Sequence, residues 1–327
     1  MTAEPPLLRV NDLRVEFPLR GRAGKRRVLR AVDGVSLTVQ PGRTLGIVGE
    51  SGCGKSTLAR ALVGLVPIAG GTLEWRGLSY ARAPEARLRP LRRAVRLVFQ
   101  DPLSSLNPRL TIGASLLEPL AWFEPQRDRA SLDAEIDRLL ERVGLPRALR
   151  ARYPHELSGG QNQRVNIARA LLAAPQIVIC DEPASALDVS LQAQILNLLR
   201  DLQQEFGVAL LFISHDLTVV RYLSDELLVM YLGRGIEQGP TAQVFERPRH
   251  PYTRALLDAV PVADPVRQRE RLLGTQPLRG EPPSPIDPPS GCAFRTRCPR
   301  ASPICGLRRP ELDRQTAHAV ACHHPLD

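Results

Sequence analysis

The sequence predicts an α/β fold built around a phosphate-binding loop, and three observations carry this prediction. Residues 49–57 read G-E-S-G-C-G-K-S-T and fit the pattern G-x-x-x-x-G-K-[ST]. An apolar run at 45–48 precedes the loop and a run of helical composition at 56–62 follows it, which is the context of such loops. Two further apolar runs, 177–180 and 208–213, end in polar residues, and parallel strands bring such ends to one edge of a sheet.

The glycine-rich loop has the chemistry of a nucleotide-binding site. Its glycines let successive backbone N–H groups converge on anionic oxygens. Lys55 can reach the β- and γ-phosphates of a nucleotide, and Ser56 can offer its hydroxyl to Mg²⁺. The loop residues expected to bind the nucleotide are Gly49, Ser51, Gly52, Cys53, Gly54, Lys55, Ser56 and Thr57.

Two acids, Asp181 and Glu182, follow the apolar run 177–180. Neighbouring carboxylates can divide the work, so Asp181 is expected to hold Mg²⁺ and Glu182 to orient and deprotonate the attacking water. The alternative is a strand that ends in a solvated acidic turn, and the phosphate-binding loop makes this alternative the weaker one.

Gln100 and His215 follow two other runs of strand type, 95–99 and 208–213. A lone histidine is usually structural, but one at the carboxyl edge of a parallel sheet lies where α/β ligands bind. We therefore expect both side chains to reach the edge that carries the acids.

In order and spacing, these motifs resemble those of the ABC-type ATPase domain. The residues that carry the resemblance are 49–57, Gln100, the segment 157–161 (L-S-G-G-Q), Asp181, Glu182, the segment 185–188 and His215. The resemblance implies ATP and Mg²⁺ as ligands. It makes Glu182 the general base and His215 a contact to the γ-phosphate. It also makes Gln100 the Q-loop glutamine beside the metal and Asp188 the D-loop aspartate.

The resemblance also implies a division of the chain. An ABC-type α/β core would comprise residues 1–100 and 176–250, and a helical subdomain that carries the 157–161 segment would be inserted at 101–175. The pattern agrees, since 130–143 and 160–172 have apolar residues at helical spacing. Residues 251–327 would form a C-terminal cysteine-rich extension.

Ser158, Gly160 and Gln161 belong to the segment that binds the nucleotide held by a partner domain in this family. One copy therefore supplies half of each site, and this chain contains one copy. The resemblance implies that the chain pairs either with a paralogous ATPase subunit or with itself.

Phe17 resembles the aromatic residue that stacks on adenine in this family. The alternative is a core residue on a strand, because Leu13, Val15 and Phe17 alternate. Base stacking needs accurate placement, and residues 19–30 separate Phe17 from the next strand. We expect stacking and keep the core position as the alternative.

Proline and cysteine distinguish the C-terminal extension. Six prolines lie between Pro277 and Pro289, which predicts an extended segment. The four cysteines of the tail are Cys292, Cys298, Cys305 and Cys322. Their spacing lacks the C-x2-C of structural zinc, and four thiolates suit [4Fe–4S]. This tail resembles the tails of peptide-transporter ATPases, which look like iron–sulfur binders. The resemblance therefore implies an iron–sulfur cluster, with zinc or plain thiols as alternatives.

From residue 6 to residue 294 and beyond, the chain is similar to ATP-binding subunits of dipeptide/oligopeptide ABC importers, and most of all to their F-type ATPase. The segments 250–253 and 290–294 narrow the resemblance to this group. It implies peptide import, with two membrane permease subunits and, indirectly, a substrate-binding protein as partners. Nickel, glutathione or another small solute is the alternative cargo. The expected location is the cytoplasmic face of the plasma (inner) membrane, as a peripheral protein.

The charge of the chain suggests another class, a soluble ABC ATPase acting on ribosomes or DNA. The formal net charge is +10, with basic runs at Arg20–Arg30 and Arg82–Arg96. These runs lack interleaved aromatic residues, so nucleic acid is not an expected partner; proximity to anionic lipid headgroups and ordinary solvated loops are the two alternatives. The rigid loop 101–108, with Leu103 and Leu106, is instead the expected docking surface for a membrane subunit.

Overall fold

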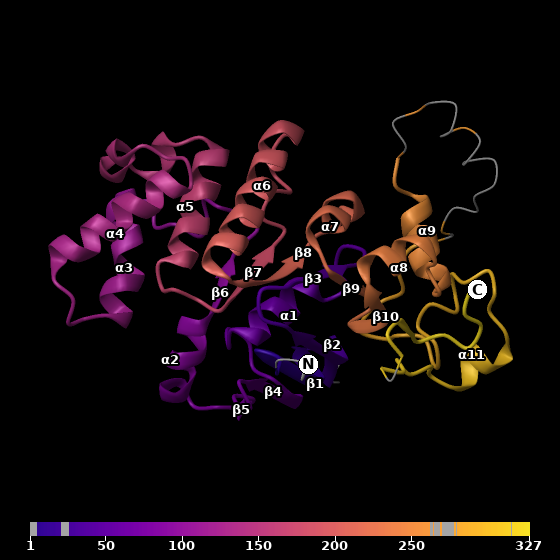
Figure 1. Cartoon of the computed structure of the whole chain (residues 1–327). Coiled ribbons are helices and arrows are strands. Elements are labelled where there is room, and N and C mark those ends of the chain that lie inside the picture. The colour runs from indigo at the N-terminus through magenta and orange to yellow at the C-terminus, as the bar shows by residue number, and fades with distance from the viewer. Residues whose placement is uncertain are drawn as a thin grey trace.

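A computed structural model describes residues 5–20, 26–261, 264, 269, 278, 280–314 and 316–327 (Figure 1). The larger of its two sheets contains β3 (Thr44–Val48), β6 (Val95–Val98), β7 (Ile177–Asp181), β8 (Ala209–Ile213), β9 (Glu226–Tyr231), β10 (Arg234–Pro240) and β11 (Ala319–Val320). The strand order is β11-β10-β9-β3-β8-β7-β6. The five strands from β9 to β6 are parallel, and β10 and β11 are antiparallel. Every residue of β3, β7 and β8 is buried, which explains their continuous apolar sequences.

A smaller antiparallel sheet packs beside the first. It contains β1 (Leu8–Arg20), β2 (Arg26–Val39), β4 (Gly70–Trp75) and β5 (Leu78–Ser79), in the order β2-β1-β4-β5. Helix α1 (Lys55–Leu62) contacts strands of both sheets. Leu8, Val10, Leu13 and Val15 on β1 are fully buried in the core that contains α1. Arg22 and Lys25 of the first basic run lie outside the described residues.

Helices gather at one end of the molecule, where Figure 1 shows α3 to α5 beside the edge strand β6. They are α3 (Ile112–Phe123), α4 (Arg129–Arg142) and α5 (Gly159–Leu171). Helix α4 matches the predicted 130–143, and α5 matches 160–172. Side chains of Thr111, Asp128 and Ser158 accept hydrogen bonds at the three helix starts, so local sequence sets these boundaries.

Helix α2 (Glu85–Ala94) was not expected from the sequence. Most of the second basic run lies on it, and Leu88, Leu91 and Ala94 form its buried face. Arginines at nearly every other position hide this narrow apolar face in a sequence scan. The run is therefore the solvated side of an amphipathic helix.

The chain after β7 returns to the larger sheet through helices. They are α6 (Val189–Phe206), α7 (Leu217–Leu223), α8 (Thr241–Glu246), α9 (Pro251–Asp258) and, in the tail, α11 (Pro303–Leu307). Residues 280–290 have neither helix nor strand, as their prolines predict, while Pro277 lies outside the described residues. Strand β11 pairs with β10, so the tail extends the main sheet. None of the helices in the described ranges is long and apolar enough to cross a membrane.

Candidate nucleotide-binding site

The phosphate-binding loop connects β3 to α1. Gly54 precedes the helix with φ 105°, and a Cβ atom there would lie 2.1 Å from the carbonyl oxygen of Ala31. Only glycine fits this backbone and this close approach. The side chain of Lys55 is buried along the loop, and its Nζ donates to the carbonyl oxygens of Gly49 at 2.7 Å and Glu50 at 3.1 Å. The ammonium group is therefore held against the backbone of the phosphate-binding loop.

Ser56, on α1, contacts Asp181, the last residue of β7. Ser56 Oγ donates to Asp181 Oδ1 at 2.9 Å. Burial raises the pKa of Asp181, and the Ser56 hydrogen bond opposes that shift. A hydroxyl and a carboxylate oxygen are donors that Mg²⁺ prefers, so these two residues fit the metal that accompanies a nucleotide.

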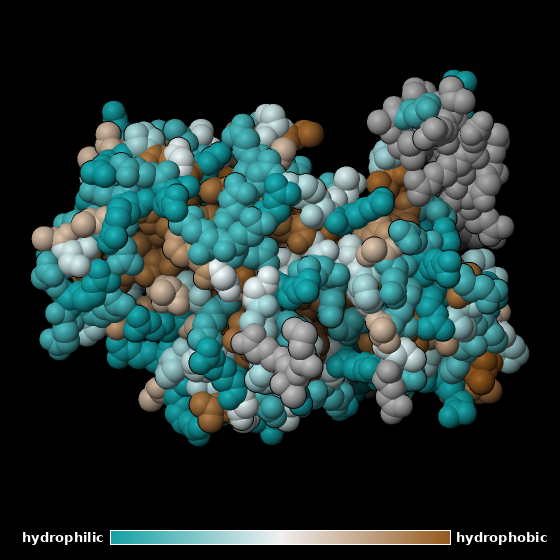
Figure 2. Space-filling model, viewed as in Figure 1, coloured by the Kyte–Doolittle hydropathy of each residue, from teal (hydrophilic) through white to brown (hydrophobic). Residues whose placement is uncertain are grey.

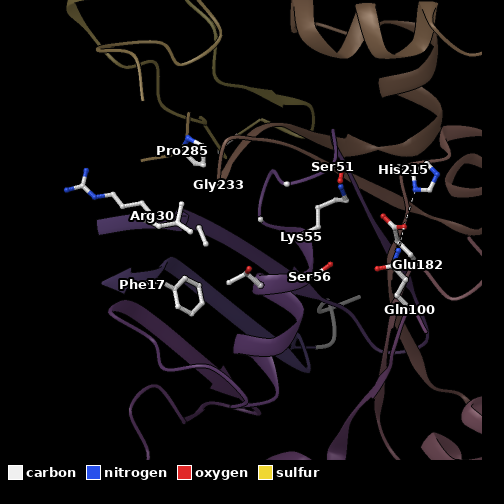
Figure 3. A pocket seen from close by; sticks show the side chains of 15 residues that line it. Phe17, Arg30, Ser51, Lys55, Ser56, Gln100, Glu182, His215, Gly233 and Pro285 are labelled. Atoms are coloured by element: carbon white, nitrogen blue, oxygen red, sulfur yellow. Dashed lines mark hydrogen bonds and ion pairs between the residues drawn. The ribbon is translucent and has the colours of Figure 1, made fainter. Parts of the chain in front are cut away.

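Glu182 is the meeting point of the predicted catalytic residues. Its Oε2 accepts a hydrogen bond from Gln100 Nε2 at 3.0 Å and lies 3.1 Å from His215 Nδ1. The three side chains come from the ends of β7, β6 and β8, as expected (Figure 3). Glu182 has φ 48°, a strained conformation for a non-glycine residue, and such strain concentrates at functional sites.

Apart from Asp181, the side chains described above line one cavity of about 490 Å³. Its lining includes Phe17, Leu29, Arg30, Ala31, Ser51, Gly52, Gly54, Lys55, Ser56, Thr57, Gln100, Glu182, His215, Gly233 and Pro285. Phe17 and Glu182 lie at opposite ends of the cavity, with Lys55 and Ser56 between them (Figure 3). Gly49 and Cys53 belong to the loop but do not line the cavity. Cys53 is buried, which raises its thiol pKa.

The remaining predicted nucleotide ligands lie elsewhere. Ser158 caps α5: its Oγ accepts from Gln161 N at 3.2 Å, and Gln161 Oε1 accepts from Ser158 N at 2.9 Å. Asp188 caps α6 in the same way, and hydrogen bonds from Ser190 and Leu191 lower its pKa. Ser158, Gly160, Gln161 and Asp188 are not among the residues that line the cavity described above.

Comparison with known proteins places the chain in a family. A family model described as "ABC transporter" matches residues 32–185, and one described as "Oligopeptide/dipeptide transporter, C-terminal region" matches residues 236–305. The oligopeptide transport ATP-binding protein OppF of Salmonella typhimurium is 50% identical over 97% of this chain and 95% of its own length. The putative oligopeptide transport ATP-binding protein YkfD of Bacillus subtilis is 47% identical over 97% and 95%.

The chain belongs to the oligopeptide transport ATP-binding proteins of ABC transporters. Solved structures agree on the fold. cbiO1 from Clostridium perfringens, part of the ABC transporter complex cbiONQ, matches with a TM-score of 0.64 and 28% identity over 74% of this chain and 92% of its own. The ATP-binding cassette MJ0796, in a dimeric post-hydrolysis state bound to ADP and Pi, matches with a TM-score of 0.64 and 25% identity over 72% and 98%. The predicted α/β fold and ABC-type ATPase are confirmed.

This ATPase also has residues at the loop that sequence reasoning missed. The Glu50 N–H donates to the hydroxyl of Tyr252 at 2.9 Å, and the Glu50 carboxylate pairs with Arg297. The Gly233 N–H donates to the Cys53 carbonyl at 2.8 Å. The segment 250–253 was noticed only as a family marker, and no local pattern reveals contacts across two hundred residues.

The four tail cysteines lie near one another without forming a ready ligand set. The pKa of Cys322 is raised to about 11, mainly by burial and to a smaller extent by the charges of Cys298, Cys292 and Cys305. Burial, followed by neighbouring thiolates, likewise raises the pKa of Cys292 and Cys298. Within the described ranges, no three His, Cys, Asp or Glu side chains converge closely enough to hold a metal ion.

Proposed function

We propose that this chain is the ATP-hydrolysing subunit that powers oligopeptide import through an ABC transporter. Lys55, Ser56 and the Gln100–Glu182–His215 cluster converge on one cavity, with Asp181 hydrogen-bonded to Ser56, and this convergence carries the proposal. The likeness to OppF over nearly the whole chain supplies the cargo class. Nickel, glutathione or another small solute is the alternative cargo for the same machinery.

The geometry supports a division of roles at the phosphates. Lys55 would bind the β- and γ-phosphates, with Ser56 and Asp181 holding the Mg²⁺ that neutralises their charge. Glu182 would accept a proton from the attacking water, and Gln100 and His215 hold its carboxylate in place from two sides. Phe17 would contact the base at the other end of the cavity.

Two such sites would form when the chain pairs with a paralogous ATPase or with itself. Ser158 and Asp188 are both exposed, and Ser158 stands at the N-terminus of α5, where backbone N–H groups favour an anion. A second ATPase presented face to face would receive these groups at its own nucleotide.

The proposed domain boundaries follow the sequence. The ATPase core comprises residues 1–100 and 176–250, the inserted helical subdomain comprises 101–175, and the C-terminal extension comprises 251–327.

A groove between α2 and α3 is the proposed docking site for a membrane permease subunit. It is lined by Arg89, Arg96, Pro119, Trp122, Phe123 and Arg169, among others, and Trp122 is 64% exposed. Figure 2 shows apolar surface over α3 and α5 at this end. Leu103 in the adjoining loop is 52% exposed, but Leu106 is only 2% exposed and belongs to the core. The prediction that Leu106 contacts a partner was therefore wrong. Docking here would place the protein peripherally at the inner face of the membrane.

An iron–sulfur cluster in the tail stays a proposal. Cys292, Cys298, Cys305 and Cys322 provide the four thiolates that [4Fe–4S] requires, and their charges influence one another. Zinc and free thiols are the alternatives, and the separation of the described side chains favours free thiols. Anaerobic purification tests this: brown protein with about four irons and four sulfides per chain supports the cluster. Colourless protein with stoichiometric zinc, or with neither metal, rejects it.

The function is tested by co-expressing the chain with the membrane subunits and binding protein encoded beside its gene. Oligopeptides should stimulate ATP hydrolysis by the assembled complex, while nickel chelates and glutathione should not. Stimulation by one of those solutes instead would identify the alternative cargo. Failure to associate with a membrane subunit, together with ATPase stimulation by RNA or DNA, would favour the soluble class.

A further inference from the structure

The C-terminal tail contacts the phosphate-binding loop through one ion pair. Arg297 Nη1 lies 2.8 Å from Glu50 Oε2, and Arg297 Nη2 lies 3.0 Å from Glu50 Oε1. This is the bidentate geometry in which a guanidinium fixes both the position and the orientation of a carboxylate. The side chain of Arg297 is 6% exposed and that of Glu50 is 24% exposed, so water screens the pair poorly.

Glu50 is restrained at every polar group that it has. Its N–H donates to the Tyr252 hydroxyl at 2.9 Å, and its carbonyl oxygen accepts from Lys55 Nζ at 3.1 Å. The same carbonyl accepts from the Cys53 N–H at 3.2 Å. Because Lys55 and Cys53 belong to the loop itself, the orientation of Glu50 is transmitted to the groups that cradle phosphate.

Arg297 is itself held by an aromatic cluster. Its guanidinium lies 6.0 Å from the ring centroid of Tyr231, and Tyr231, Tyr252 and Phe294 pack together with centroid separations of 4.8–5.4 Å. The Arg297 N–H donates to the Phe294 carbonyl at 2.9 Å, which closes the turn that carries the arginine. The tail therefore presents Arg297 to the loop from a rigid base.

The charge of Arg297 also affects how well the loop can bind an anion. Without Arg297, the Glu50 carboxylate would be an unpaired negative charge in the loop that must receive a polyphosphate, and like charges oppose such binding. With Arg297 present, the carboxylate is neutralised and the loop can accept the anion.

We propose that Arg297 is a positioning residue for ATP binding, which acts through Glu50 by ordering the phosphate-binding loop and by neutralising its carboxylate. This inference rests on the assignment of the loop to ATP. Arg297 is not among the residues that line the cavity, and its guanidinium reaches the loop at Glu50. Its loss should therefore weaken the binding of ATP more than it slows turnover at saturation.

The test measures KM and kcat for ATP in the assembled transporter, and equilibrium binding of labelled ATP to the full chain. We expect Arg297→Gln to raise KM and Kd about tenfold while kcat changes less than about threefold. Arg297→Lys keeps the positive charge but cannot make the bidentate contact to Glu50, so its KM and Kd should lie between those of wild type and Arg297→Gln. Arg300→Gln is the matched control, because Arg300 is exposed on the same segment and donates to the Pro325 carbonyl oxygen.

The decisive variant is Glu50→Gln combined with Arg297→Gln. If Arg297 acts through the Glu50 charge, Arg297→Gln should raise KM less than about threefold in the Glu50→Gln background. A tenfold increase in both backgrounds, or no increase in either, would overturn the proposal. Thermal unfolding of each variant reports separately whether the tail remains folded. If Lys55→Ala also leaves ATP binding unchanged, then the nucleotide site itself is misassigned, and the proposed function fails with it.

Discussion

Glu182 shows how one side chain depends on three strands. Its backbone N–H donates to the Ile213 carbonyl at 2.9 Å, which ties the end of β7 to β8. Its carboxylate then reaches Gln100 beyond β6 and His215 beyond β8. The polar ends of three parallel strands therefore converge on the carboxylate that the function assigns as the base.

Replacing that carboxylate is the first prediction. Glu182→Gln keeps the shape of the side chain and removes its basicity, so turnover should fall on the order of 10²-fold or more while ATP still binds. Steady-state hydrolysis in the assembled complex measures the first effect and equilibrium binding the second. Glu246→Gln, at an exposed glutamate of α8, serves as the control. Turnover of the Glu182 variant within about threefold of wild type would exclude Glu182 as the base.

His250 gives a prediction about pH. It is fully buried, which lowers its pKa to about 3, and its Nδ1 accepts from Tyr252 N at the start of α9. An unfolded histidine takes up its proton near pH 6.5, so between about pH 6.5 and 3 only the unfolded chain is protonated at this site. The free energy of unfolding should therefore decrease as the pH is lowered through this range, by up to about 1.4 kcal/mol per pH unit from this group.

The matched variant is His250→Asn, which keeps a capping acceptor and does not titrate. Between about pH 6.5 and 5, wild type should lose about 2 kcal/mol more unfolding free energy than the variant loses. Denaturant titrations at a series of pH values measure this difference. Parallel curves for the two proteins would show that His250 does not carry the proton linkage.

Sequence reasoning found most of the residues that line the cavity, because their spacing along the chain is local to each motif. It did not find Glu50, Tyr252 or Arg297 as partners, since an ion pair between positions 50 and 297 leaves no local pattern. Phe17 lines the cavity and also packs against the core, so its stacking on adenine stays a prediction.

In the loop 101–108, two leucines that the sequence treats alike have different environments in the structure. Leu103 and Leu106 are three residues apart in one turn, with the Leu106 N–H donating to the Leu103 carbonyl at 3.3 Å. Yet one side chain faces solvent and the other the core. Periodicity gives no answer in a loop, because neither the helical nor the strand repeat applies there.

This difference predicts opposite effects for two substitutions. Leu106→Ala should lower the free energy of unfolding by about 2–5 kcal/mol, as other buried leucines do. Leu103→Asp should change it by less than about 0.5 kcal/mol, since Leu103 is exposed, and should weaken association with the membrane subunits. Denaturant unfolding and co-purification measure the two properties. Normal co-purification of Leu103→Asp would remove this loop from the docking surface.

Helix α5 offers a test of pairing at the same scale. Ser158→Asp keeps a good N-cap for the helix, because aspartate caps as well as serine does. Its negative charge would face the γ-phosphate of a partner, so hydrolysis in the assembled complex should fall at least about tenfold. ATP binding to the isolated chain should stay unchanged. Weaker binding in the isolated chain would place Ser158 at its own nucleotide and contradict the paired site.

The whole molecule is one ATPase core with additions at both ends of its main sheet. The helices α3 to α5 adjoin β6 at one edge, and the tail adds β11 at the other (Figure 1). The sequence predicted the core from continuous apolar runs around the phosphate-binding loop, and the helical insertion from apolar residues at helical spacing. It did not predict that the tail would join the sheet, since a two-residue strand has no periodicity to detect.

The most direct test of the account is ATP-driven uptake of a labelled oligopeptide by vesicles that contain the assembled transporter. Wild-type chain should accumulate the peptide only with ATP inside the compartment that the chain faces. Glu182→Gln and Lys55→Ala should each abolish accumulation, the first with ATP bound and the second without it. Undiminished uptake by either variant, or accumulation without ATP, would contradict the conclusion that this chain powers import.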